Sequence, residues 1–196
     1  SYAQSGKWGD LVAAILCDGK ADLKRYVWLD VFAVRQWPSE TPDLDFASTI
    51  EHCSSFMVVC SHQQAVVDMK VADIVCGRME KLPKEVRVQI CFLRVWCLVE
   101  AHKACTMPEM PFILRAGSYK ISENGDISFQ NSRMVDNMQY LVNVEKAEAT
   151  VESDRERILG GIRQDTGGGI GRLNRAIRGA VIGARAGAGG GSDVVL

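Results

Sequence analysis

The sequence lacks several features that would place it in a well-marked class of proteins. Its 23 basic and 24 acidic residues give a formal net charge of −1, so no overall electrostatic force draws it toward nucleic acid or an anionic membrane. No apolar run approaches the ~20 residues that span a bilayer. The three histidines, His52, His62 and His102, show no metal-ligand spacing. These absences argue against a membrane-spanning protein, a zinc enzyme and a nucleic-acid-binding protein.

The cysteines also lack an expected pattern. There are seven of them, an odd number, and no two form a Cys-x-x-Cys pair. They are better explained as reduced, mostly buried residues than as a disulfide framework or a zinc site. Reduced thiols are typical of the cytoplasm, so we expect a cytoplasmic protein without a bound metal.

What is present favours an α/β fold. The chain has 196 residues, 47% of them hydrophobic, which is enough for one well-packed domain. Apolar residues recur at helical spacing over 8–19, and residues 41–43 supply a helix start. Nearly continuous apolar runs at 26–34, 56–60 and 112–114 predict strands that are buried on both faces. Strands that alternate with helices predict a parallel sheet.

The remaining segments complete the expected organisation. Residues 86–92 fit both strand alternation and one helical face, and we favour a short strand followed by a helix from about Leu93. Residues 123–126 predict a hairpin turn. We therefore expect an α/β domain at 1–131, a helical extension packed on it at 132–186, and a flexible tail at 187–196. The extension carries two apolar stripes, Ile158-Leu159-Ile162 and Ile170-Leu173-Ile177-Val181.

Two segments carry the functional information. In the segment from Arg94 to Glu100, Trp96 and Glu100 are four residues apart, so a helix would place a carboxylate beside an aromatic ring. In the segment from Tyr26 to Phe32, Asp30 follows an apolar run and would lie where a strand reaches its loop. Open α/β sheets bind ligands at the carboxyl ends of their strands.

These segments resemble a known family. Trp96-Cys97-Leu98-Val99-Glu100 resembles the Trp-Cys-x-x-Glu helix of Toll/interleukin-receptor (TIR) domains, and Tyr26 to Phe32 resembles their second strand. Both are also similar to motifs of fungal heterokaryon-incompatibility domains, which are similar to TIR domains. Ser1-Tyr2 and Lys7 to Val12 resemble the end of the first TIR strand and its helix. The resemblance covers about residues 1–117 and implies a flavodoxin-like, TIR-like parallel sheet flanked by helices.

The resemblance also implies a chemistry. In catalytic TIR domains the helix glutamate binds the ribose hydroxyls on the nicotinamide side of NAD and helps to cleave the N-glycosidic bond. Such a bond breaks through an oxocarbenium-like state whose positive charge a carboxylate stabilises. Glu100 then takes the catalytic position, with Trp96 as its aromatic neighbour and Asp30 as the strand-end carboxylate. The loop that faces the phosphates or the adenine contributes Ser5, Lys7 and Trp8. NAD is a substrate rather than a cofactor, and the implied partner is a second copy or another protein in stress or defence signalling.

Each assignment has a simpler alternative. Glu100 can be a surface residue paired with Lys103, Trp96 a core residue, and Asp30 a cap of the following turn. Lys7 and Trp8 can be a solvated lysine and a core tryptophan at a helix start. The glycine-rich segment 164–172 is better explained as a turn between helices than as a phosphate loop. The alternative function is therefore a TIR-like interaction module, or a structural subunit of a larger assembly, without turnover.

Overall fold

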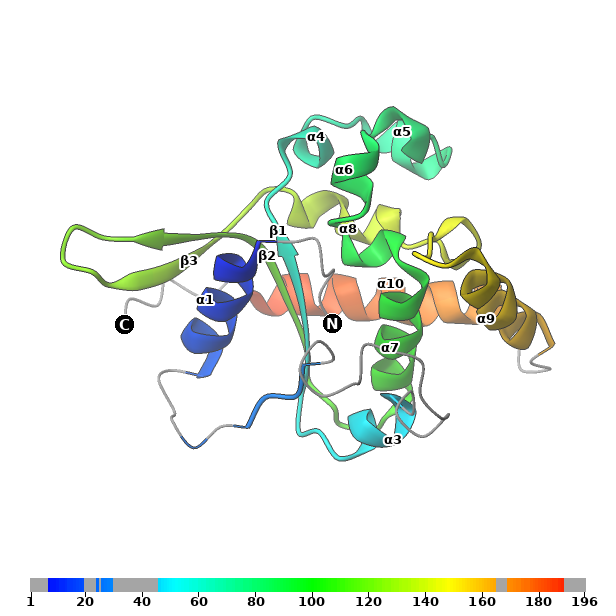
Figure 1. Cartoon of the computed structure of the whole chain (residues 1–196), viewed down its shortest axis with the longest axis horizontal. Coiled ribbons are helices and arrows are strands. Elements are labelled where there is room, and N and C mark those ends of the chain that lie inside the picture. The colour runs from blue at the N-terminus through cyan, green and yellow to red at the C-terminus, as the bar shows by residue number, and fades with distance from the viewer. Residues whose placement is uncertain (1–6, 20–23, 25, 30–45, 165–168, 189–196) are drawn as a thin grey trace.

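The computed structural model describes residues 7–19, 24, 26–29, 46–164 and 169–188, which form a mixed α/β structure with a sheet flanked by helices (Figure 1). The strands are β1 (Phe56–Ser61), β2 (Phe112–Ile121) and β3 (Ile127–Asn131). The α-helices are α1 (Trp8–Gly19), α3 (Phe46–Glu51), α4 (Gln64–Val67), α5 (Val71–Val75), α6 (Lys84–Arg87), α7 (Val95–Thr106), α8 (Val135–Leu141), α9 (Glu152–Gln164) and α10 (Gly169–Ala188). Short 3-10 helices are η2 (Met79–Lys81), η3 (Cys91–Leu93) and η4 (Val144–Lys146).

The described strands pair in the order β1-β2-β3. β1 and β2 are parallel, with Phe56 opposite Phe112 and Ser61 opposite Gly117. β2 extends beyond the end of β1, and the chain then turns back so that β3 pairs antiparallel with this outer part of β2. The extra pairing explains why β2 is longer than the strand predicted at 112–114. The predicted hairpin is confirmed, and Gly125 supplies the left-handed conformation of its turn with a φ of 87°.

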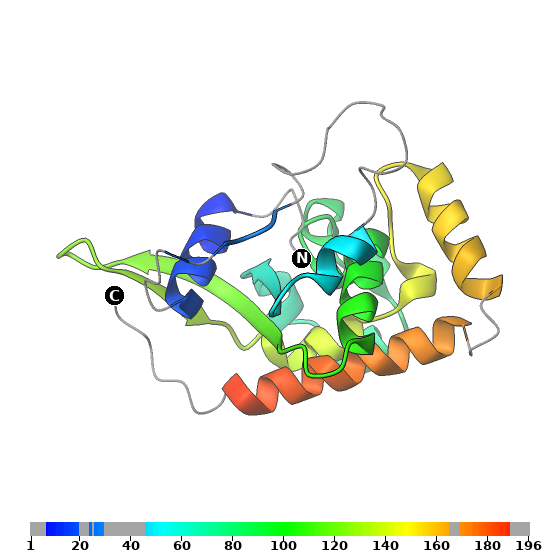
Figure 2. The same ribbon diagram turned by 90° about the horizontal axis from the view of Figure 1, so that it is seen from below.

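Side-chain alternation along β1 divides its residues between two cores. Phe56, Val58 and Cys60 join a large cluster together with residues of α7, α8 and α10. Val59 joins a smaller cluster with Leu11 and other residues of α1. Figure 2 shows α1 on one side of the sheet and α10 on the other. The sheet is therefore covered on both faces, as the continuous apolar runs at 56–60 and 112–114 predicted.

The strand predicted at 26–34 is wrong where the structure describes it. Residues 26–29 have no regular secondary structure, and Tyr26 is fully exposed. An apolar run becomes a strand only where a neighbouring strand supplies hydrogen bonds, and Trp28 instead packs its ring edge-on against Phe46, with 5.8 Å between ring centroids. Residues 30–34 and the helix start predicted at 41–43 lie outside the described residues.

The strand predicted at 86–92 is also wrong. This stretch forms the end of α6, a turn and η3, with turn-type hydrogen bonds such as Val86 N–H to Pro83 O (3.0 Å) and Leu93 N–H to Ile90 O (3.0 Å). Pro83 begins the helical turn, since its fixed φ suits a helix start. The helix predicted from about Leu93 is confirmed as α7, which begins at Val95.

Residues after 132 are largely helical, as expected. Leu159 of α9 and Leu173, Ile177 and Val181 of α10 are buried in the large cluster, so both predicted stripes face the core. The predicted tail begins within α10, and residues 189–196 lie outside the described part of the chain. Among the described helices, none combines the length and the apolar character needed to cross a membrane.

Candidate active site

Helix α7 holds Trp96 and Glu100 in place. Two backbone hydrogen bonds to Glu148 fix the start of this helix. Val95 N–H donates to Glu148 O (2.9 Å), and Glu148 N–H donates to Leu93 O (2.8 Å). Leu98 and Ala101 face the core and are fully buried. Trp96 and Glu100 lie on another side of the helix, where both are half-buried. The four-residue spacing thus places the two side chains one above the other, as the sequence predicted.

Aromatic contacts surround Trp96. Its ring meets the Phe46 ring at 5.7 Å between centroids and an interplanar angle of 64°. Phe46 in turn meets Trp28 edge-on. The guanidinium of Arg157, on α9, lies 5.6 Å from the centroid of the Trp96 ring. Edge-to-face ring pairs and a cation over an aromatic face are each attractive, so these contacts hold α3, α7, α9 and residues 26–29 together.

These contacts connect the two segments singled out in the sequence. Trp28 belongs to the first segment and Trp96 to the second, and Phe46 touches both rings. Asp30 stands two residues beyond Trp28 in the sequence but lies outside the described residues. The structure therefore brings Trp28, from the described part of the first segment, to the side of α7 that carries Trp96.

Lys103, which the simpler alternative paired with Glu100, also contacts α3. Its Nζ forms an ion pair with Glu51 Oε1 at the end of α3, and Thr106 Oγ1 donates to the Lys103 carbonyl oxygen at 2.7 Å. The ion pair adds a second connection between α3 and α7. Lys103 thus stabilises the packing of α3 on the helix that carries Glu100.

Lys7 and Trp8 lie at the start of α1, next to a different element. The backbone N–H of Lys7 donates to Ser61 Oγ (3.0 Å), which places this start at the carboxyl end of β1. Both side chains are exposed, and Trp8 is therefore not the core residue of the simpler alternative. The contacts of Lys7 and those of Trp96 thus involve different elements. Ser5 lies outside the described residues.

Sequence reasoning missed two hollows of the described surface. The first has a volume of about 370 Å³ and is lined by Ala65, Asp68, Met69, Lys70, Asp73, Lys81 and Leu82. The second has a volume of about 240 Å³ and is lined by His102, Gly161, Ile162, Gly169, Arg172 and Leu173. Neither is lined by Trp96 or Glu100. The glycine-rich segment 164–172 was the only signal in the sequence for the second hollow, and nothing marked the first.

The described residues also include no group of three or more His, Cys, Asp or Glu side chains arranged to hold a metal ion. A comparison of the chain with protein-family models, curated proteins and solved structures finds no significant match. A functional assignment therefore rests on the residues themselves, and above all on the side of α7 that carries Trp96 and Glu100.

Proposed function

We propose that the chain is a TIR-like enzyme that cleaves the N-glycosidic bond of NAD. The observation that carries this proposal is the contact series from Trp28 through Phe46 to Trp96. It joins the segment that leads to Asp30 with the helix that presents Glu100, although the two segments are some sixty residues apart. Two carboxylates beside an aromatic ring would suit a cationic nicotinamide ribosyl group, and in this proposal Asp30, Glu100 and Trp96 supply them.

In this proposal Glu100 is the catalytic residue. The bond between the ribose C1′ and the nicotinamide nitrogen breaks with its electron pair going to the nicotinamide, which leaves as a neutral molecule. The Glu100 carboxylate stabilises the positive charge that develops on the ribose. Water then adds to C1′ and releases a proton, so that the products are ADP-ribose, nicotinamide and a proton. Asp30 and Trp96 position the ribose and the nicotinamide ring.

The test replaces the charge of Glu100 and keeps its shape. Purified protein is incubated with NAD, and nicotinamide release is followed by liquid chromatography. We expect Glu100→Gln to lower the rate by roughly 10²–10³-fold, because one preorganised electrostatic group contributes about that much to a rate. Glu123→Gln, the same change at an exposed position of the hairpin turn, should leave the rate unaltered. Equal turnover by Glu100→Gln and the wild type would exclude Glu100 from catalysis.

A second candidate is a TIR-like interaction module without turnover. The Arg157 guanidinium favours it, because this cation lies over the Trp96 ring where a stacked nicotinamide would otherwise bind. In that case Trp96, Phe46 and Arg157 are packing residues, and the fold alone serves recognition. A wild-type protein that releases no nicotinamide at high concentration or with a crowding agent would favour this function over catalysis.

A further inference from the structure

The start of α1 is tied to two strands of the sheet. Lys7 N–H donates to Oγ of Ser61, the last residue of β1, at 3.0 Å, and Ser61 is fully buried. Three residues after Lys7, Asp10 Oδ1 accepts a hydrogen bond from Tyr119 N–H of β2 at 2.9 Å. A Cβ added at Gly9 would lie 2.5 Å from Cε1 of the Tyr119 ring, so the helix backbone and this ring are in close contact. The first turn of α1 therefore has a fixed place at the carboxyl end of β1.

Asp10 makes its attachment beyond the end of β1. The last residue of β1 lies opposite Gly117, and Tyr119 lies two residues further along β2, so the Asp10 carboxylate supplies an acceptor where β1 no longer does. The side chain of Asp10 is fully buried, and its Oδ2 has no hydrogen-bond partner among the described residues. Burying a carboxylate oxygen without a donor costs free energy of folding. Natural proteins keep such costly groups mostly at functional sites, so stability alone does not explain Asp10.

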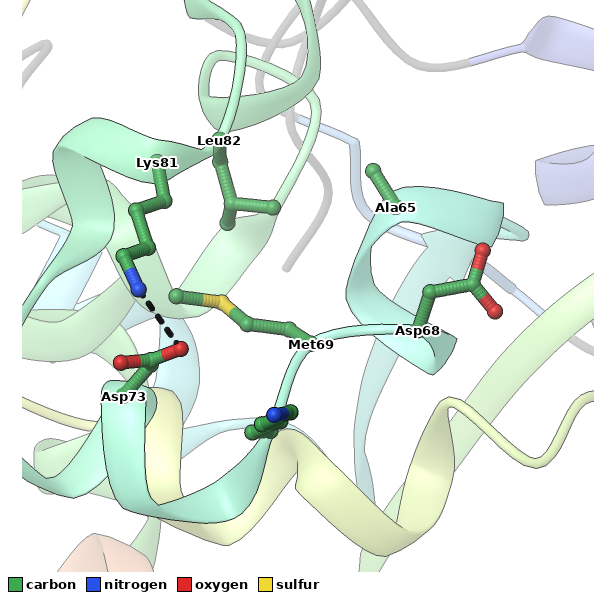
Figure 3. Close-up of a pocket in the computed structure, with 7 residues that line it drawn as sticks. Ala65, Asp68, Met69, Asp73, Lys81 and Leu82 are labelled. Atoms are coloured by element: carbon green, nitrogen blue, oxygen red, sulfur yellow. Dashed lines mark ion pairs between the residues drawn. The ribbon is translucent and has the colours of Figure 1, made fainter.

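The two side chains that this turn presents are exposed. Lys7 and Trp8 both reach solvent, and they stand at the carboxyl end of a parallel strand, where open α/β sheets bind ligands. An ammonium group pairs with a phosphate and an indole stacks on a base, so the pair suits a nucleotide. Neither hollow includes a residue of α1, and Figure 3 shows the first one among residues 65–82. A nucleotide at the start of α1 would therefore contact exposed side chains, whose place depends on the turn that carries them.

We propose that Asp10 is a positioning residue, which holds Lys7 and Trp8 where they bind the ADP part of NAD. This inference rests on the proposed function and adds a determinant of its substrate affinity. Asp10 acts through the backbone of α1, because its own carboxylate is buried. A small displacement of a binding group is enough to lower affinity. Loss of the contact with Tyr119 should thus weaken nucleotide binding without altering the chemistry at Glu100, which lies on α7.

The test compares two aspartates of the same helix. Asp10 and Asp18 both join α1 to β2, and Asp18 does so by an ion pair with Arg115 at 3.0 Å. Isothermal titration calorimetry measures the Kd of ADP-ribose, which has no nicotinamide bond to cleave. We expect Asp10→Ala to raise this Kd at least about tenfold, whereas Asp18→Ala should leave it within about twofold of the wild type. Asp10→Asn should also stay close to the wild type, because its amide oxygen can still accept from Tyr119 N–H.

Steady-state kinetics with NAD separates positioning from catalysis. For Asp10→Ala the KM for NAD should rise at least about tenfold while kcat stays within about twofold, because the contact is lost equally from bound substrate and transition state. Ser61→Ala is a milder variant that releases only the Lys7 N–H, and it should raise the Kd and the KM in the same direction. It decides the question if circular dichroism shows that Asp10→Ala does not fold.

The outcomes distinguish the role of Asp10 from NAD cleavage. If the protein releases no nicotinamide but binds ADP-ribose, and Asp10→Ala weakens this binding, the cleavage is refuted and the role of Asp10 stands. If nicotinamide is released with a KM that neither Asp10→Ala nor Ser61→Ala changes, the role of Asp10 alone is refuted. It is also refuted if Asp18→Ala or Asp10→Asn weakens binding as much as Asp10→Ala does. A wild type that neither binds ADP-ribose nor releases nicotinamide overturns both proposals.

Discussion

The thiols show how single residues respond to their surroundings. Cys60, Cys91 and Cys97 are buried in or beside the contact between β1 and η3, and Cys91 Sγ donates to Val59 O at 3.0 Å. A hydrogen-bonding contact with Cys60, together with complete burial, raises the pKa of Cys91 well above its ordinary value. Cys91 therefore remains protonated, and all three pack as small apolar residues, as expected for reduced, buried cysteines. Cys76 departs from that expectation, since it is exposed.

Cys105 gives a residue-scale prediction. Burial raises the pKa of its thiol to about 11, so at pH 8 only ~0.1% of it is the reactive thiolate. We expect iodoacetamide at pH 8 to modify exposed Cys76 at least about tenfold faster than Cys105. The rate at Cys105 should rise about tenfold for each pH unit up to its pKa. Peptide mass spectrometry of timed samples measures both sites, and equal rates at pH 8 would contradict the raised pKa.

At the scale of the element, the hairpin depends on one close approach between strands. A Cβ added at Gly117 of β2 would lie 1.9 Å from the carbonyl oxygen of Gln130 on β3. The obstacle is backbone, which cannot rotate away as a side chain would. Gly117 therefore lets β3 pair closely with β2. Just beyond β3, Ser132 Oγ lies 2.6 Å from His62 Nδ1.

A matched pair of substitutions tests this requirement. Gly117→Ala should lower the free energy of unfolding by about 1–3 kcal/mol, the usual cost of forcing extra volume into a packed site. Gly179→Ala, on an exposed face of α10 where an added Cβ meets nothing within 4 Å, should raise it by roughly 0.5–1 kcal/mol. Urea denaturation followed by circular dichroism gives both values. A stabilised Gly117→Ala protein would mean that the strands are not held so closely.

Elements differed in how far the sequence predicted them. The strands at 56–60 and 112–114, the hairpin, and α7 followed from apolar runs and turn residues, because those signals are local. The strand predicted at 86–92 is wrong, and so is the strand predicted at 26–34 over its described residues 26–29. Strand formation needs a hydrogen-bonding neighbour that a local pattern does not reveal. That Trp96 and Glu100 share one face of α7 was predictable from their four-residue spacing. The residues that contact Trp96 were not predictable.

Phe46 and Arg157 illustrate why those contacts were out of reach. They lie 50 residues before and 61 residues after Trp96 in the sequence, and neither stands in a motif. Their meeting depends on how α3 and α9 pack, which is a tertiary property. The hollow between α4 and α5 was equally hidden, because it is formed by short helices that carry no strong periodic pattern.

At the scale of the whole molecule, α10 joins elements that are distant in the sequence. It packs against α7, α8 and β2, and Figure 2 shows it running along one side of the molecule. Arg178 donates two hydrogen bonds to Val142 O, at 2.7 and 3.1 Å, and Arg185 pairs with Asp136 at 2.8 Å. The polar contacts hold α10 beside α8 while its apolar stripe completes the large cluster.

If α10 completes the core, one substitution on its inner stripe should matter and the same substitution on its outer face should not. Ile177 is fully buried, and Ile182 is 52% exposed. We expect Ile177→Ala to cost about 2–5 kcal/mol, because it removes buried methylene groups and leaves a cavity. In a chain of this length that corresponds to a fall in Tm of roughly 4–20 °C. Ile182→Ala should stay within about 0.5 kcal/mol of the wild type, as exposed substitutions usually do. Differential scanning calorimetry distinguishes the two, and similar Tm values for both variants would mean that α10 lies on the domain without sharing its core.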